Sequence, residues 1–333
     1  MSVSKLEKVR VAVIGVGSLG QHHARIYADN RSCELVAVVD NNPKVAKEFA
    51  KKYKVKGLTD YEQLVGQVDA VSVVVPTFLH HQVASFFLKN DIHVMVEKPI
   101  TSRVEDAHDL ISLAHEHGLV LQVGHIERFN QAILQLQKVV TKPAYIEAHR
   151  LSPYSGRIQD VGVVLDLMIH DLDIVLQLVN SPLCENGIDA VGIGVYGQHE
   201  DIANVRLHFQ SGAMATLTAS RVSPMKLRKI RIFQANTFIS ADYVEQSMDV
   251  YRRVVDEDVP PGEPKVKIIH TKPEIKSKES LKLELESFLD CVKKHHEPVV
   301  KGEHARDALE LAVMITEQIK ERLQMQFKAF LDV

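Results

Sequence analysis

The sequence has 333 residues, a length that favours two domains over one. Its 40 basic and 43 acidic residues leave a net charge of −3, which gives no strong attraction to nucleic acid or anionic lipid, so we expect neither as a partner. Three widely spaced cysteines with no CxxC pair argue against a zinc site or disulfides, so we expect no metal. No signal peptide and no apolar run long enough to cross a membrane is visible in the sequence, so we expect a cytoplasmic protein.

The first 124 residues alternate short apolar runs with helical patterns. The runs lack polar alternation, which is typical of strands buried on both faces of a parallel sheet; they cover residues 9–14, 35–39, 70–75, 92–96 and 119–123. Helical patterns lie between them at residues 19–28, 43–52, 80–89 and 104–117. This alternation predicts an α/β domain at residues 1–124, a Rossmann doubly wound parallel sheet.

Residues 125–333 have a different pattern and predict an α+β domain with an open, mainly antiparallel sheet. Longer segments alternate polar and apolar residues, as strands with one wet face do; they cover residues 144–151, 188–196, 203–209, 213–221 and 228–233. We expect helices at residues 163–178, 280–294 and 303–326, and a loop rich in proline and charge at 256–278. An uncovered sheet face would favour association.

A glycine-rich turn follows the first predicted strand and precedes a helix. It comprises Gly15, Gly17, Ser18, Leu19 and Gly20. Its glycines suit a tight turn, a close approach to a pyrophosphate and close packing of helix on strand, and the helix N–H groups suit an anion. Asp40, at the end of the next strand, would bind ribose hydroxyls and repel a 2′-phosphate, which favours NAD over NADP. A structural turn in a protein that binds a flavin or S-adenosylmethionine is the alternative.

Glu97, Lys98 and Pro99 directly follow another buried strand. The carboxyl ends of parallel strands are where ligands bind in such sheets. Packing does not explain a lysine at this position, so we interpret Lys98 as functional; the alternative is a solvated loop charge. The bond between Lys98 and Pro99 is one that can adopt the cis form.

Asp166 and His170 lie four residues apart in an otherwise apolar helical segment, which places them on one helix face. Asp173 falls on the same side. A core histidine with hydrogen bonds is one alternative, and an Asp/His metal site is another, although no third ligand is in view. Carboxylates on an apolar helix need a reason to be there, and this favours a functional pair.

Oxidation of a secondary alcohol accounts for these residue types. A base must take the hydroxyl proton as hydride leaves carbon, and histidine suits this because its pKa lies near working pH. A lysine cation near the same oxygen stabilises the developing alkoxide. An aspartate can orient the imidazole or bind a neighbouring hydroxyl.

Together these motifs resemble the Gfo/Idh/MocA family of sugar and cyclitol oxidoreductases. The likeness extends over the whole chain and includes the glycine turn, Asp40, the segment from Pro76 to His80, residues 97–99 and the Asp166/His170 pair. It implies that Lys98, Asp166 and His170 are catalytic. It also implies that Pro76, His80, Glu97 and Lys98 lie beside the cofactor. It further implies a homodimer or homotetramer that forms through a large open sheet.

The substrate is indicated by resemblance alone. Segments 124–130 and 166–173 look most like family members that oxidise the 3-hydroxyl of nucleotide-linked amino sugars such as UDP-N-acetylglucosamine. The resemblance assigns Arg128, Asn130, Arg157 and His170 to the substrate. A diphosphate needs cations, and Arg128, Arg150, Arg157 and Arg221 lie in segments suited to supply them, with exposed strand-end arginines as the alternative.

Two departures from the family pattern concern the substrate subgroup. Gly162 is the only glycine in the stretch before the catalytic helix, and Gln131 replaces a common proline. A free sugar or a cyclitol such as myo-inositol is therefore the alternative substrate. A non-catalytic, dinucleotide-sensing regulator is the second alternative, against which the presence of Lys98 and His170 argues.

Overall fold

The computed structural model describes residues 8–154, 161–196, 199–256 and 265–331, with side chains described to residue 324. The chain divides into two compact units. The first comprises residues 1–126 and 279–309, and the second comprises 127–278 and 310–333. The N-terminal boundary thus lies two residues beyond the predicted one, and a C-terminal segment returns to the first unit.

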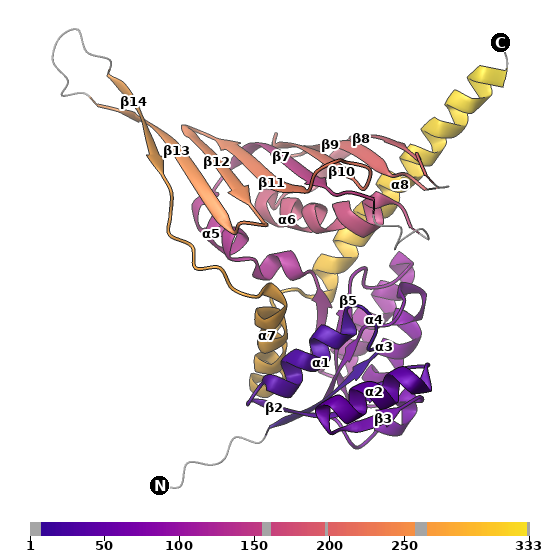
Figure 1. Cartoon of the computed structure of the whole chain (residues 1–333). Coiled ribbons are helices and arrows are strands. Elements are labelled where there is room, and N and C mark those ends of the chain that lie inside the picture. Colours follow the sequence, from indigo (N-terminus) through magenta and orange to yellow (C-terminus); the bar gives the residue numbers. More distant parts are fainter. Residues whose placement is uncertain (1–7, 155–160, 197–198, 257–264, 332–333) are drawn as a thin grey trace. The chain divides into compact units, whose positions relative to one another are not determined.

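The first unit contains a six-stranded parallel sheet of strand order β3-β2-β1-β4-β5-β6, which confirms the predicted Rossmann fold (Figure 1). Its strands are β1 (Val9–Ile14), β2 (Cys33–Val39), β3 (Lys56–Leu58), β4 (Ala70–Val73), β5 (His93–Glu97) and β6 (Leu121–Gly124). Its connecting helices are α1 (Gly20–Asp29), α2 (Pro43–Tyr53), α3 (His80–Leu88) and α4 (Val104–Glu116), with the short turns η1 (Tyr61–Leu64) and η2 (Thr77–Leu79). The strand order reverses between β1 and β4, where such sheets bind ligands beyond the carboxyl ends of their strands.

Helix α7 (Ser280–Lys294) completes the core of this first unit. Its Leu285 and Phe288 are fully buried in the same apolar cluster as Val11 and Met95. The prediction of residues 125–333 as one domain is therefore wrong for 279–309. Periodicity finds the apolar stripe of a helix but does not say which sheet that stripe covers.

The second unit contains an eight-stranded sheet of order β14-β13-β12-β11-β7-β10-β9-β8. Its strands are β7 (Pro143–Leu151), β8 (Leu183–Ile193), β9 (Ile202–Phe209), β10 (Met214–Ser220), β11 (Leu227–Gln234), β12 (Thr237–Asp242), β13 (Ser247–Val255) and β14 (Val266–Thr271). All described pairs are antiparallel except β10 with β7, so the predicted mainly antiparallel sheet is confirmed. Strands β12 and β13 were not predicted, and β14 lies inside the predicted loop.

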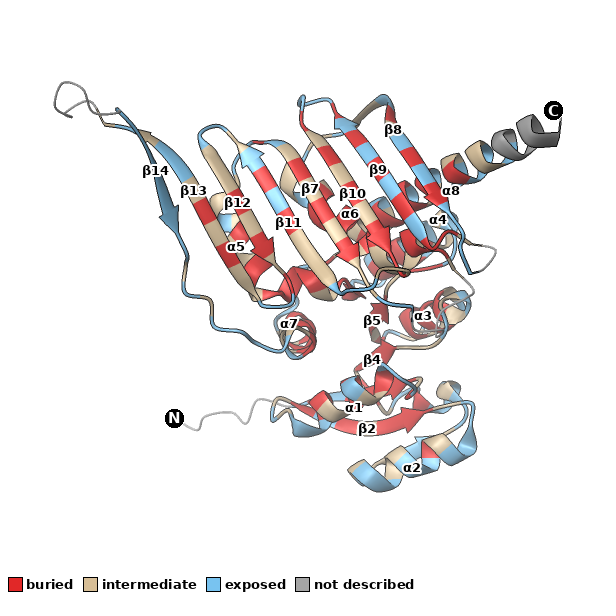
Figure 2. Cartoon of the chain, turned by 45° about the horizontal axis from the view of Figure 1, so that its top comes forward, coloured by how far each residue is buried: buried red, intermediate tan, exposed pale blue. Residues whose placement is uncertain are grey.

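One face of this sheet is covered by helices. Helices α5 (Gln131–Val139) and α6 (Ile169–Val179) pack on it, as does the π-helical segment η4 (Val164–Met168) (Figure 1). Helix α8 (Gly302–Leu331) starts in the first unit and continues in the second, where Gln318 bonds the backbone of β8. Along β9, buried and exposed residues alternate strictly, and the banding in Figure 2 shows the same pattern on neighbouring strands. Each such strand therefore has an inner, buried face and an outer face.

The outer face carries a row of rings on five adjacent strands. Tyr145, Phe233, Phe238, Tyr251 and His270 stack in sequence, with centroids 4.4 to 5.7 Å apart. Cross-strand register brings these rings together, although they are distant in the sequence.

Candidate functional site

The glycine turn joins β1 to α1, and its three glycines are required for different reasons. Gly15 has φ +85°, and a Cβ there would lie 2.5 Å from the Val74 carbonyl oxygen. A Cβ on Gly20 would lie 1.8 Å from the Gly15 oxygen. A Cβ on Gly17 would meet no protein atom within 4 Å. Gly15 and Gly20 therefore fix the turn itself, whereas Gly17 leaves open space above the backbone.

The open side of the turn presents hydrogen-bond donors. Within the described residues, the N–H groups of Gly17, Ser18 and Leu19 donate to no protein acceptor. They lie at the start of α1, where the helix dipole also favours negative charge. The residues present therefore fit the pyrophosphate of a dinucleotide.

Asp40 lies beside this turn. Its Oδ2 accepts a hydrogen bond from the Val16 N–H at 3.1 Å, and its Oδ1 accepts one from the Asn42 N–H at 2.9 Å. These bonds hold a half-exposed carboxylate at the end of β2, next to the anion cradle. Its place suits ribose hydroxyls and opposes a 2′-phosphate.

His80, predicted to lie against the cofactor, is buried. Its Nδ1 lies 2.8 Å from the Pro99 carbonyl oxygen, and its Nε2 lies 2.9 Å from the Val75 carbonyl oxygen. Burial lowers the pKa of His80, although the two carbonyls act in the opposite direction. His80 therefore ties the loop after β4, which contains the exposed Pro76, to the loop after β5.

Glu97 is also buried and supports Lys98 from within the domain. Its Oε1 lies 3.2 Å from His23 Nε2, and its Oε2 accepts the Lys98 N–H at 3.2 Å. The carboxylate occupies the space over Gly124, where a Cβ would lie only 2.7 Å from Oε2. The Lys98–Pro99 peptide is cis. The Glu97 oxygens thus position the Lys98 turn, and the contact of Glu97 with the cofactor stays a prediction.

The predicted catalytic helix is not a regular α-helix. Asp166 lies in η4, and His170 lies at the start of α6; both are half-exposed. Such π-helical turns occur frequently at functional sites. Glu200 caps the segment, since its Oε1 accepts the Val164 N–H at 3.2 Å and its carboxylate fills the space over Gly162. Only a residue without a side chain fits there, which explains Gly162.

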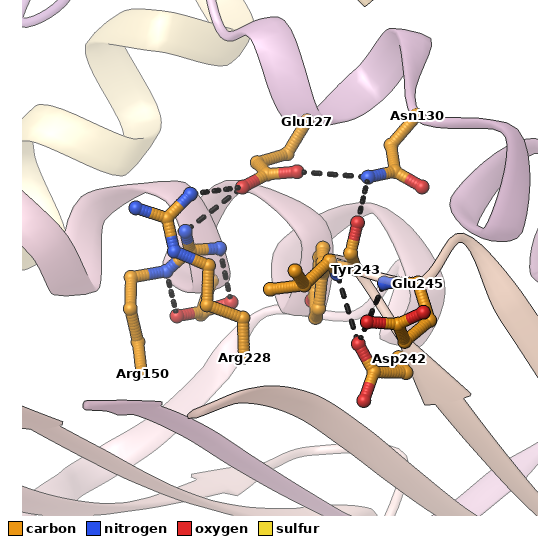
Figure 3. Close-up of polar contacts among 9 residues, drawn as sticks. Glu127, Asn130, Arg150, Arg228, Asp242, Tyr243 and Glu245 are labelled. Atoms are coloured by element: carbon orange, nitrogen blue, oxygen red, sulfur yellow. Dashed lines mark hydrogen bonds and ion pairs between the residues drawn. The ribbon is translucent and has the colours of Figure 1, made fainter. Parts of the chain in front are cut away.

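Two aspartates after His170 anchor this helix. Asp171 binds Arg150 through two bonds of 2.7 and 3.0 Å, and Asp173 binds Arg128 through two bonds of 2.5 and 2.7 Å. Arg150 also donates to Glu127 at 2.8 Å (Figure 3). All five side chains are buried. Burial of ions is costly, but removal of one partner costs more, so these pairs fix the helix on the sheet.

Several predicted substrate ligands are therefore structural. Arg128 and Arg150 are committed to buried carboxylates, and Arg221 binds Asp201 and the Val161 carbonyl oxygen. The buried Asn130 caps α5 and donates to the Tyr243 carbonyl oxygen at 2.9 Å and to Glu127. The structure thus places Arg128 and Asn130, which were predicted to bind substrate, in buried contacts with Asp173, with Glu127 and with the Tyr243 carbonyl oxygen. Arg157 lies outside the described residues.

The network includes residues that sequence reasoning missed. Tyr243 places its ring 5.2 Å from the Arg150 guanidinium carbon, and Glu127 joins Arg150 to Asn130 (Figure 3). Arg228 lies beside Arg150 on the next strand. A sequence signal existed only for Glu127, which lies within the segment 124–130 used for the resemblance. Among the described residues, no cluster of three potential metal ligands occurs.

Comparison with known proteins supports the site. Residues 9–125 match the model of an oxidoreductase family with an NAD-binding Rossmann fold, named GFO/IDH/MocA, and residues 140–237 match the C-terminal domain model of the same family. The chain belongs to the Gfo/Idh/MocA oxidoreductase family. It is 34% identical to a UDP-N-acetylglucosamine 3-dehydrogenase from Acidithiobacillus ferrooxidans, over 95% of this chain and 99% of that protein.

The structural comparison agrees. A solved structure of that Acidithiobacillus enzyme superimposes with a TM-score of 0.88 over 96% of this chain and 99% of its own. A myo-inositol 2-dehydrogenase from Thermotoga maritima is 26% identical, over 96% of this chain and 99% of that protein. The matched residues 9–125, which the family model describes as an NAD-binding Rossmann fold, include the glycine turn. In the part of the chain that the structure describes, no helix is long and apolar enough to cross a membrane.

We expect Asp40→Ser to narrow the preference for NAD over NADP about fivefold to tenfold, because it removes the charge that repels a 2′-phosphate. Steady-state kcat/KM for the two cofactors would measure this. Asp60→Ser is the matched control, since Asp60 also accepts a backbone N–H after a strand but caps η1. An unchanged ratio in Asp40→Ser would contradict the assignment of Asp40 to the ribose.

Proposed function

We propose that this chain is an NAD-dependent dehydrogenase that oxidises the 3-hydroxyl of a nucleotide-linked amino sugar such as UDP-N-acetylglucosamine. The observation that carries the proposal is the 34% identity to a UDP-N-acetylglucosamine 3-dehydrogenase over nearly the whole of both chains. The NAD-binding family model and the anion cradle at the glycine turn support the cofactor. The Asp166/His170 helix, held by two buried ion pairs, supports the catalytic assignment.

We propose that Lys98, Asp166 and His170 perform the proton chemistry. NAD, when bound, accepts the hydride from the substrate carbon. His170 takes the hydroxyl proton as the carbonyl forms, since imidazole titrates near neutral pH. The Lys98 ammonium stabilises the negative charge that develops on the same oxygen. Asp166 orients the imidazole or binds a neighbouring substrate hydroxyl.

The substrate assignment predicts a specific pattern of activity. With NAD, we expect NADH formation with UDP-N-acetylglucosamine and little or none with myo-inositol, glucose or free N-acetylglucosamine. Absorbance at the NADH band measures this across the series, and UDP-N-acetylglucosaminuronate tests whether a carboxylate on the sugar is preferred. NADH formation with myo-inositol or glucose alone would contradict the nucleotide-sugar assignment and favour the cyclitol alternative.

The catalytic assignment predicts loss of turnover without loss of cofactor binding. Lys98→Ala and His170→Ala should each lower kcat by roughly 100- to 10,000-fold, because each removes a group that acts in the transition state. NADH fluorescence titration should give unchanged affinity. Lys89→Ala and His208→Ala, both at exposed positions, are the matched controls. Normal turnover in either catalytic variant would refute its role, and turnover equally low in the wild type would favour a non-catalytic regulator.

We propose further that the chain forms a homodimer or homotetramer in the cytoplasm, where its three free cysteines would remain reduced. The stacked rings on the outer face of the second unit's sheet support the association, because copies that meet there would bury apolar rings. Light scattering should give at least the mass of a dimer for the wild type and a smaller mass for Phe233→Asp. A wild-type monomer at micromolar concentration would refute the association.

A further inference from the structure

Arg228 and Arg150 are neighbours on the buried face of the second unit's sheet. Strands β11 and β7 pair Arg228 directly with Arg150. The alternation along β11 puts Arg228 on the same face as the buried Ile230 and Ile232, whereas Arg231 lies on the outer face beside Glu147. The two arginines are thus neighbours on one face of the sheet, where their like charges repel each other.

The two arginines differ in how their charge is compensated. Arg150 is 2% exposed and donates to Asp171 and Glu127. The Arg228 side chain is 34% exposed, and its Nη1 lies 3.6 Å from Glu127 Oε1, too far for a hydrogen bond. Across the described residues, the Arg228 guanidinium donates no hydrogen bond, and its Nε is buried without a partner.

The unpaired donors of the Arg228 side chain lower the stability of the fold, and no side-chain hydrogen bond of Arg228 offsets this loss. A buried donor without an acceptor costs free energy, and such groups in native proteins need an explanation. Burial and the neighbouring Arg150 lower the pKa of Arg228, while Glu127, Asp171 and Asp166 act in the opposite direction. An arginine that served only to stabilise the fold would be paired as Arg150 is.

The position of Arg228 connects it with the proposed chemistry. Asp166, on the helix that also carries His170, lies within electrostatic range of the Arg228 guanidinium. Figure 3 shows Arg228 beside Arg150 and Glu127. Arg150, which pairs with Arg228 across the strands, bonds Asp171, the residue after His170, so the donors of Arg228 lie on the side of the sheet that this helix covers.

We propose that Arg228 binds an anionic oxygen of the substrate, namely the phosphate attached to the sugar. The inference rests on the proposed function, in which the phosphate on C1 and the reacting 3-hydroxyl belong to one sugar ring. A guanidinium presents its N–H groups as a fork that matches two phosphate oxygens, and a bound phosphate would satisfy the buried Nε. Arg228 thus takes the role that the sequence gave to Arg128, Arg150 and Arg221.

The experiment compares substrates that differ in their anionic groups. Wild type, Arg228→Gln and Arg228→Lys are assayed with NAD against UDP-N-acetylglucosamine, N-acetylglucosamine 1-phosphate, free N-acetylglucosamine and UDP-N-acetylglucosaminuronate. Arg228→Gln should raise KM for both phosphorylated amino sugars roughly 10- to 100-fold, with any activity on the free sugar unchanged. Arg228→Lys keeps the charge but loses the two-pronged guanidinium, so its KM for these substrates should lie between those of the wild type and Arg228→Gln. A larger loss confined to the uronate would assign the carboxylate instead of the phosphate and overturn the proposal.

Folding is measured separately. Because the Arg228 side chain donates no hydrogen bond within the described residues, Arg228→Gln should keep the wild-type Tm or raise it, and NADH affinity should not change. Arg231→Gln on the outer face of the same strand is the matched control and should leave KM unchanged. A lowered Tm with unchanged KM would show a structural role and overturn the inference.

The result also separates this inference from the proposed function. If the wild type oxidises UDP-N-acetylglucosamine and Arg228→Gln does so with the same KM, the inference alone fails. If the wild type oxidises only unphosphorylated sugars and neither phosphorylated sugar inhibits it, both fail.

Discussion

The second unit depends on one buried interaction, the ion pairing of Arg150 with Asp171 and Glu127. Arg150 comes from the centre of the sheet, Asp171 from the helix that carries His170, and Glu127 from the segment η3 (Ile126–Phe129) that begins the unit. Each carboxylate would be costly to bury alone, so the three groups are stable only together. This requirement sets where the helix lies on the sheet and hence where Asp166 and His170 are presented.

In the first unit, one buried carboxylate likewise supports a proposed catalytic residue. Glu97 lies inside the domain against His23 and Gly124, and it holds the backbone of Lys98. In both units an acidic residue is the chain neighbour of a proposed catalytic residue. Glu97 precedes Lys98 and bonds His23, and Asp171 follows His170 and bonds Arg150. The supporting contacts are made in the interior, which leaves the functional side chains partly exposed and free to meet ligands.

Arg228 is informative because it breaks this pattern. Its neighbour Arg150 shows that the sheet can fully pair a buried guanidinium, whereas Arg228 Nε and the Tyr243 hydroxyl have no hydrogen-bond partner among the described residues. Unsatisfied polar groups in an otherwise satisfied network are typical of binding sites, where the missing acceptor comes with the ligand. Arg128, Arg150 and Arg221, which the sequence suggested as phosphate ligands, are paired with buried carboxylates. Arg228, which the sequence did not suggest, has unpaired donors.

The sequence by itself determined the Rossmann sheet, the glycine turn with Asp40, and the candidates Lys98, Asp166 and His170, because these depend on local spacing and on periodicity along the chain. Only the tertiary structure decided which unit α7 joins, that Glu97 and His80 support loops, and that Arg128 and Asn130 are structural. An arginine near a site has the same local pattern whether or not it is paired. Its partner is set by strand register and helix packing between residues far apart in the chain, as Arg128 and Asp173 show.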